Sequence, residues 1–287
     1  MTEYSRFDIR QFVTGKTAKR FVLYLSVVAI LVLFAFPLYW MFVSSIKPMS
    51  EIMSYPPALV PNELTLENYL QLIEDTDYLV WLQNSLIVSI GNVLLSVTLS
   101  VMAGYGLTRY DFPYKSVFAY SFLIGYMFAP MMLGVPYYML FYRFGLLDTY
   151  PGLILAHASI TVPFTIWLMW QFFQTVPIDW EEAAWICGAS RYKAMLEIAI
   201  PGAIPGIIAS AIFAFAISWN DYTFALVIMS SPSKQMLTTG VAQFMSGTQV
   251  YWHYLMTGAS LLIIPPLLIV FFLNKYILEG FSMGGFD

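Results

Sequence analysis

Six apolar stretches decide what this chain can fold into. They fall near residues 21–44, 84–107, 116–142, 152–172, 204–228 and 255–277. Each holds about 20 residues or more, enough to cross as a helix a hydrocarbon core of about 30 Å. Helix is expected because backbone N–H and C=O groups must all be paired where lipid surrounds them. The sequence therefore predicts an all-α membrane protein with six transmembrane helices.

The composition agrees with this prediction. Hydrophobic residues make up 59% of the 287 residues and charged residues 10%, against about 25% charged in a typical soluble domain. Membrane lipid is therefore the expected surrounding. The net charge of −4 gives no reason to expect a nucleic-acid partner. Cys187 is the single cysteine, and His157 lies far from His253 in sequence, so we expect no disulfide, metal or cofactor in this chain.

The chain ends are assigned from charge and length. Residues 1–20 are polar and hold five cations, and the apolar run after them is longer than the core of a signal peptide. We therefore expect 21–44 to be a retained first helix. An acidic extracytoplasmic loop at 45–83, a permease-like core at 84–277 and a tail at 278–287 complete the predicted division.

Lysine and arginine indicate the orientation. With an even number of spans both ends lie on one side, and cations are enriched on the cytoplasmic side. Ten cations then lie inside and three outside. The inner ones are Arg6, Arg10, Lys16, Lys19, Arg20, Arg109, Lys115, Arg191, Lys193 and Lys275, and the outer ones are Lys47, Arg143 and Lys234. Both termini are expected to be cytoplasmic.

The inner segment at 174–203 predicts two short helices and a tight turn. Asp179 and Glu182 have the spacing of a capping box, and Gly188 can end the first helix in a left-handed conformation. One face of that helix holds Trp180, Ala183, Ala184 and Cys187. Ser190 is expected to cap the second helix. The same spacing recurs in Tyr192, Met195, Leu196 and Ala199, after which Pro201 is expected to stop the helix.

Spacing alone leaves two interpretations of this segment. The first helix presents small side chains, which suits insertion into a groove on a partner. The alternative is a helix that lies on the lipid headgroups.

The residues of this segment also carry a resemblance. The stretch EEAAWICGASRYKAMLEIAIPG resembles the EAA loop of bacterial ABC importer permeases, whose pattern is Glu-Ala-Ala, three residues, Gly, nine residues, Ile-x-Leu-Pro. The matching positions here are Glu182, Ala183, Ala184, Gly188, Ile198, Ile200 and Pro201. Two departures are Ile200 in place of leucine and Cys187 in place of an aspartate common before the glycine.

The resemblance implies a mechanical role. In that family the loop forms a coupling helix that sits in a cleft of a cytoplasmic ATPase subunit and moves with it. The residues that this assigns to ATPase coupling are Glu182, Ala183, Ala184, Gly188, Ala189, Arg191 and Lys193. Glu182 is expected to cap the helix and also to meet the ATPase. Arg191 and Lys193 face either acidic groups on the ATPase or solvent and headgroups.

Further segments resemble the MalG-type permeases of carbohydrate importers such as those for maltose. They include FPLYWMFVSSIKP (36–48), GYGLTRYDF (104–112), GLLDTYPGLIL (145–155), ISWNDYTFALVI (217–228) and NKYILEGFSMGGFD (274–287). The resemblance implies the type I importer permease fold in the cytoplasmic membrane and a sugar as cargo. It also implies several partners, namely a second homologous permease, a dimer of ATPase subunits that bind ATP and Mg, and an extracytoplasmic solute-binding protein.

The candidate cargo path lies in the fifth span, at Trp219, Asn220, Asp221 and Tyr222. Asp221 is the one acid placed within a span, and an acid at membrane depth must face protein or water. It lines the path, or it lies solvated near the outer interface, or it bonds within the bundle and holds helices together. Because consecutive helical residues point about 100° apart, Asn220 and Asp221 are the expected lumen pair, with Trp219 toward a neighbouring helix.

Two competing classes remain at this point. One is an ABC permease for another solute, which the EAA loop does not exclude. The other is a secondary transporter, which usually needs titratable relays within its spans. One acid, Asp221, and one histidine, His157, give little support for such a relay. The sequence has no nucleophile elbow, no H-E-x-x-H and no Walker A loop, so it is not expected to be an enzyme, and the ATPase should be a separate chain.

Overall fold

The structure, a computed structural model, describes residues 9–127, 130–245 and 250–283. All regular secondary structure in these ranges is helical. Arg6 and the last four residues of the predicted tail lie outside these ranges. The longer helices are α1 (Ile9–Ser45), α4 (Tyr78–Arg109), α5 (Lys115–Tyr126), α6 (Pro130–Phe144), α7 (Tyr150–Thr175), α11 (Ile204–Trp219) and α14 (Trp252–Met283). The shorter elements are α2 (Met49–Ile52), α3 (Glu67–Asp75), α8 (Ile178–Ile186), α9 (Arg191–Ala194), η1 (Met195–Ala199), α10 (Ile200–Gly202), α12 (Thr223–Ile228), η2 (Pro232–Lys234) and α13 (Leu237–Gln243).

Four of the described helices are long and apolar enough to cross a membrane, and up to six spans result if each of two bent helix pairs forms one span. The four are residues 19–45 of α1, the whole of α4, the whole of α7, and residues 252–273 of α14. The last of these runs unbroken through Pro265 and Pro266.

The third predicted span, 116–142, is not a single helix. Its residues form α5 and α6, whose axes differ by 91°. Pro130 is the first residue of α6, and proline favours a helix start because it has no N–H to donate to the preceding turn. Both halves are apolar, so hydropathy alone does not reveal the break.

The fifth predicted span, 204–228, is also divided. α11 ends at Trp219 and α12 begins at Thr223, with Asn220 and Asp221 in the break between them. The segment before α11 is bent as well: residues 191–202 meet α11 at 73°. Asparagine and aspartate favour such breaks because their side chains hydrogen-bond nearby backbone groups.

The centre of the bundle is the pair α4 and α7. At Gly104 an added Cβ would lie 2.7 Å from Met169 Cβ and 2.9 Å from the backbone nitrogen of Trp170, so only glycine permits this approach. Asn92 of α4 donates its side-chain amide to the Ala214 carbonyl of α11 at 2.9 Å and accepts from Thr161 of α7. A buried amide thus ties the three helices together in the membrane interior.

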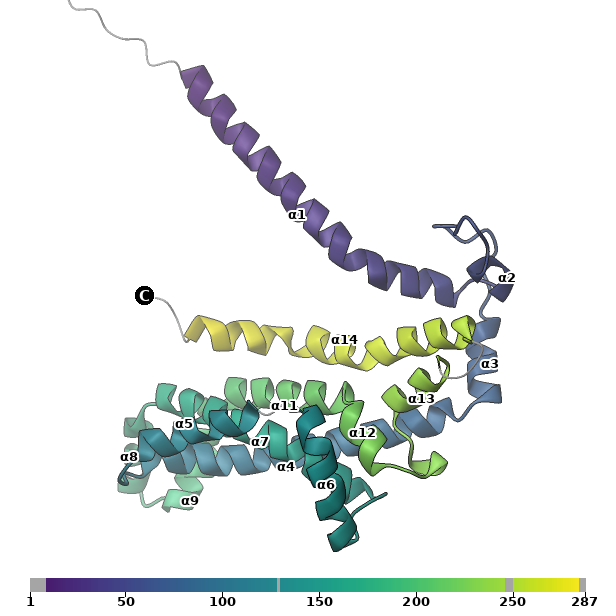
Figure 1. The fold of residues 1–287 in the computed structure, drawn as a ribbon. Coiled ribbons are helices and arrows are strands. Elements are labelled where there is room, and N and C mark those ends of the chain that lie inside the picture. The colour runs from purple at the N-terminus through teal and green to yellow at the C-terminus, as the bar shows by residue number, and fades with distance from the viewer. Residues whose placement is uncertain (1–8, 128–129, 246–249, 284–287) are drawn as a thin grey trace, which may run out of the picture.

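The two ends of the bundle differ. Figure 1 shows α8 and α9 near the C-terminal end of α4, and α2, α3 and α13 near its N-terminal end. The N-terminal part of α1 stands apart from the bundle (Figure 1), while its C-terminal part packs beside α14. The 45–83 loop is ordered around Lys47, which is buried and lies 5.0 Å over the Trp40 ring.

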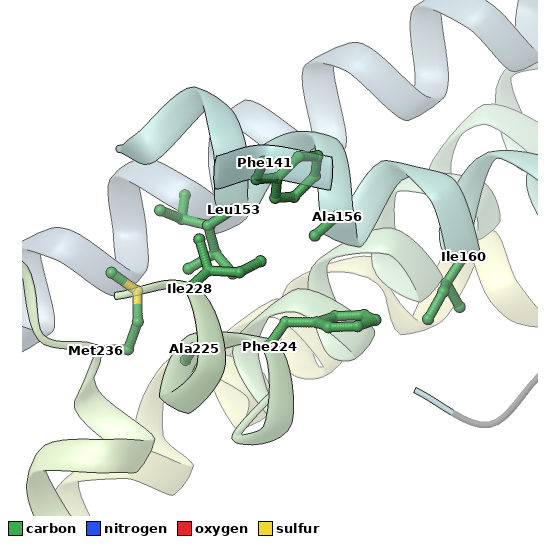
Figure 2. Packing of buried hydrophobic residues seen from close by; sticks show 9 residues of the cluster. Phe141, Leu153, Ala156, Ile160, Phe224, Ala225, Ile228 and Met236 are labelled. Atoms are coloured by element: carbon green, nitrogen blue, oxygen red, sulfur yellow. The ribbon is translucent and has the colours of Figure 1, made fainter. Parts of the chain in front are cut away.

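A buried apolar cluster fixes α12 after the break. Leu153, Ala156 and Ile160 of α7 pack with Phe141 of α6 and with residues of α12. Figure 2 shows Phe224, Ala225 and Ile228 of α12 pointing into this cluster. Burial of these side chains holds α12 against α6 and α7, which in turn places the break at residues 220–222.

Candidate coupling site and candidate cargo cleft

The turn after α8 forms as its sequence predicts. Gly188 has φ +90°, its N–H donates to the Trp185 carbonyl at 2.9 Å, and the Ala189 N–H donates to the Ala184 carbonyl at 3.0 Å. This pair of bonds is a Schellman motif, which satisfies carbonyls that the helix end would otherwise leave unpaired. Ser190 then caps α9 by accepting from the Lys193 N–H at 3.2 Å.

The predicted capping box at the start of α8 is wrong. The helix begins at Ile178 with Pro177 as its N-cap, and no side chain caps it. Asp179 is therefore already inside the first turn, where an acid is stabilised by the helix dipole instead. Glu182 is exposed and does not cap. Pro177 decides the register because its fixed φ already suits the residue that precedes a helix.

The face of α8 with small residues is open. Trp180, Ala183 and Cys187 are exposed, Ala184 is partly buried, and Ile186 is 88% exposed. An apolar surface of this kind at the end of the bundle is available to a partner or to headgroups, the two interpretations that spacing left open.

The second helix does not keep the predicted spacing. Residues Met195–Ala199 form a π-helical turn, which shifts the register. Tyr192 is exposed whereas Ala199 is fully buried. Pro201 does not stop the helix either: it lies in the first turn of α10, and that helix ends only at Gly202, with Ala203 as its C-cap.

The two cations of the loop have partners within the loop itself. The Arg191 guanidinium lies 5.4 Å over the Trp185 ring, a cation–π contact. Lys193 Nζ is 3.9 Å from Glu197 Oε2 on an exposed face, a pair worth little in water. Lys193 therefore remains available to an acidic partner.

The acid that the structure buries here is Glu181. Its side chain is 0% exposed. Oε1 accepts from Arg109 Nε at 2.6 Å, and Oε2 accepts from the Tyr105 hydroxyl at 2.7 Å. Arg109 also donates to the Val176 carbonyl at 2.9 Å. From the sequence Arg109 was only a topology signal, and neither Glu181 nor Tyr105 was a candidate site residue. The available signal was the spacing: Tyr105 and Arg109 are four apart at the inner end of a span.

At the break in the fifth span Asp221 joins two helices. Its Oδ2 accepts from the Ala225 N–H at 2.9 Å and its Oδ1 from the Phe224 N–H at 3.3 Å, which are donors that a new helix start leaves unpaired. His157 of α7 is 2% exposed, with Nε2 3.2 Å from Asp221 Oδ2 but outside hydrogen-bond alignment. Its Nδ1 lies 2.8 Å from the Ser218 hydroxyl.

The same break borders a cleft of about 440 Å³. Its walls include His157, Asn220, Asp221, Tyr222, Thr223 and Phe224. Trp219, one of the four predicted path residues, is not among the lining: it is buried, stacks on Phe215 and donates its indole N–H to the Leu262 carbonyl of α14 at 3.0 Å. In the described part of the chain no cluster of His, Cys, Asp and Glu residues could hold a metal.

Residues 96–282 match a protein family described as a binding-protein-dependent transport system inner membrane component. The chain belongs to this family. As a family member it is a permease component of the inner membrane, and the match extends from the middle of α4 almost to the end of α14.

Two relatives match the permease over most of their length. The inner membrane ABC transporter permease protein YcjP of Escherichia coli K12 is 30% identical over 273 residues, covering 94% of this chain and 97% of that protein. The diacetylchitobiose uptake system permease protein NgcG of Streptomyces coelicolor is 34% identical over 253 residues, covering 87% of this chain and 83% of that protein.

A solved structure shares the fold. A chain of a bacterial ABC transporter involved in the import of the acidic polysaccharide alginate superposes with a TM-score of 0.76, over 96% of this permease and 100% of that chain. The two sequences are 20% identical, so the likeness concerns the arrangement of the helices. The all-helical bundle with its bent spans is thus an ABC importer permease fold.

Proposed function

We propose that this permease is a translocation subunit of an ATP-driven sugar importer, coupled through α8 to a separate ATPase. The observation that carries the proposal is the exposed helix α8 closed by the Gly188 turn, within a sequence of the EAA type. Glu182, Ala183, Ala184, Gly188, Ala189, Arg191 and Lys193 form the ATPase-facing surface in this proposal. The ATPase subunits act as a dimer and bind ATP and Mg; this chain carries out no chemistry of its own.

The proposed topology has six spans with both termini in the cytoplasm. The two bent pairs, each read as one span, add two crossings to the four formed by single long helices. Ten cations on the α8 side against three on the other support the orientation. A second homologous permease completes the path, and a solute-binding protein delivers cargo at the end that holds α2, α3 and α13.

A sugar is the proposed cargo. One of the relatives is named for diacetylchitobiose uptake and the solved structure for alginate import, so carbohydrate recurs among the proteins this chain resembles. The cleft supports the same class, because Asn220, Tyr222 and Thr223 place amide and hydroxyl groups along its wall. Such groups pair with the hydroxyls of a neutral sugar. Trp219 packs away from the cleft and is assigned to structure.

The test is purification of the permease with the proteins encoded beside it, followed by reconstitution into proteoliposomes. We expect ATP hydrolysis to rise several-fold with one or a few members of a sugar panel, and the same sugars to accumulate inside. Stimulation by amino acids, peptides, phosphate or metal ions but by no sugar would instead establish an ABC permease for another solute. Uptake driven by an ion gradient without ATP would identify a secondary transporter.

A further inference from the structure

We propose that Glu181, Tyr105 and Arg109 form a latch that locks α8 to α4, so that movement of α8 enters the membrane through α4. The inference rests on the proposed coupling role of α8. It assigns a positioning role to three residues that lie outside the EAA surface. We call these three residues the α8–α4 latch.

An acid holds α8 against the bundle. Glu181 is the only fully buried residue of this nine-residue helix. The apolar side chains Trp180 and Ile186 point outward and are exposed. Ala184 and Trp185 are partly buried, so the one side chain that α8 buries completely is a carboxylate. Helices at the surface of a bundle are normally anchored by an apolar stripe, so an acid in this position has a different task.

The geometry of the latch fixes how α8 sits on α4. Both carboxylate oxygens are used, at 2.6 Å to Arg109 Nε and 2.7 Å to the Tyr105 hydroxyl. Tyr105 and Arg109 are four residues apart and so lie on one face of the last turns of α4. Two bonds from one helix to one carboxylate fix both position and orientation, which a single bond does not.

The energetics of a buried ion pair also favour a positioning role. Taking two charges out of water costs about as much as their attraction returns, so such pairs add little net stability, whereas removing one partner leaves an uncompensated charge. Arg109 is 9% and Glu181 0% exposed. A contact that barely stabilises the fold but fixes one geometry is suited to transmitting position.

The links that join α8 to its neighbours are not helical. Before it, Val176 and Pro177 are extended, and after it Gly188 makes a left-handed turn. The Val176 carbonyl accepts from Arg109 as well, so α4 also holds the chain just before α8. α4 itself is a continuous helix of 32 residues that meets α7 closely at Gly104 and α11 through Asn92. A displacement passed to α4 therefore reaches the central helices directly.

The experiment measures sugar transported per ATP hydrolysed, in proteoliposomes that hold the complete importer. Glu181→Gln keeps the shape but removes the charge, and we expect the ratio to fall at least about fivefold while hydrolysis continues. Tyr105→Phe removes one hydroxyl and should lower the ratio by a smaller factor. The matched control is Glu197→Gln, which neutralises a carboxylate of the same loop that is 64% exposed; its ratio should equal that of the unaltered protein.

A tether separates transmission from folding. Cys187 is the single cysteine, so Cys187→Ser gives a background without thiols. In this background we expect the double variant Tyr105→Cys, Glu181→Cys to uncouple transport from hydrolysis. Joining the two thiols with a short bifunctional reagent should restore the ratio, because a covalent link replaces the latch. If Glu181→Gln does not assemble, Tyr105→Phe and the tether decide the question.

Two results would overturn the latch. One is a normal transport ratio in each latch variant that assembles, and the other is a tethered double variant that stays uncoupled although it assembles. Failure of the proposed function looks different: the unaltered complex itself would then hydrolyse ATP without moving any sugar.

Discussion

Gly188 shows how much a single backbone angle can determine. Its φ of +90° lies in the left-handed region, and an added Cβ would meet nothing within 4 Å. Any penalty for a side chain here is therefore conformational and not a clash with neighbours. That penalty is about 1–2 kcal/mol for an L-residue with a Cβ, is largest for β-branched residues, and is smaller for asparagine.

The first prediction follows because the cost of a side chain at Gly188 is conformational and not steric. Gly188→Val should leave the permease in the membrane but lower the transport ratio at least about fivefold, because the turn between α8 and α9 opens. Gly188→Asn should retain most coupling, since asparagine tolerates positive φ. Both are measured as sugar moved per ATP in proteoliposomes. Normal coupling in the valine variant would show that the turn has no part in it.

Asp221 has two roles at once at the break. It accepts from two α12 amides and lies against buried His157, and it also borders the cleft. Removing a side chain that caps a helix costs about 1 kcal/mol. Losing the Asp221 side chain should affect the shape of the cleft more than the stability of the fold, because α12 forms part of the cleft wall.

The second prediction separates charge from capping. At matched expression Asp221→Ala should lose most uptake, whereas Asp221→Asn should keep most of it, because an amide oxygen can still accept from the α12 backbone. Uptake of labelled sugar into vesicles is the readout. A strong loss in the asparagine variant would point to an ionised acceptor for sugar hydroxyls, and normal uptake in the alanine variant would exclude both roles.

Among the elements, the turn between α6 and α7 organises the opposite end of the bundle. Asp148 Oδ1 accepts from the Ser230 and Ser231 amides at 3.1 and 3.0 Å, and its Oδ2 lies 3.6 Å from Lys234 Nζ. Burial alone would raise the pKa of Asp148, but the hydrogen bonds from both serines and the ammonium of Lys234 outweigh it, so the pKa is lowered. The carboxylate thus clamps the segment after α12 to the start of α7.

The third prediction is the pH dependence of this clamp. A lowered pKa means that the folded form favours the ionised carboxylate, so the clamp is at full strength above the ordinary value of 3.8 and weakens as the pH falls below it. Hydrogen exchange at Ser230 and Ser231, corrected for intrinsic rates, should be constant from neutral pH to about pH 5 and faster in more acidic buffer. Asp148→Ala, which leaves no acceptor for the two serine amides, should exchange fast at every pH. Equal protection in both proteins would contradict the clamp.

At the scale of the whole molecule, the described chain has exposed apolar surface along most of its length. Residues 19–45 of α1 have no buried portion in their most apolar window, and α8 presents an open face at one end. Lipid covers the former in the proposed topology, and the ATPase covers the latter. The single cysteine, exposed at the end of α8, reports on both the orientation and the docking.

The fourth prediction uses that cysteine. A membrane-impermeant thiol reagent should label Cys187 in inside-out vesicles and not in intact cells, and docked ATPase should protect it. Cys187→Ser is the control for non-specific labelling. Labelling from outside intact cells would contradict the proposed six-span topology, and equal labelling with and without the ATPase would contradict docking on α8.

Features within a few residues of one another could be predicted from the sequence. The apolar runs followed from composition, the Gly188 turn and the Ser190 cap from local hydrogen bonding, and the family from the EAA spacing. These depend on the chain nearby and not on its partners in space. Even so, two local predictions were wrong. The N-cap of α8 is Pro177 and not Asp179, and the chain forms a π-helical turn and stays helical through Pro201.

The tertiary structure alone decided which polar groups meet. Glu181 and Glu182 are adjacent and chemically alike, yet one is buried on Arg109 and Tyr105 while the other faces out. That choice depends on how α8 is rotated against the end of α4, at a sequence separation of 72 residues. The same holds for His157 beside Asp221 and for the breaks after α5 and α11. The sequence determined which segments are apolar enough to enter a membrane because transfer from water to lipid depends on composition, whereas pairing between helices depends on geometry between distant segments.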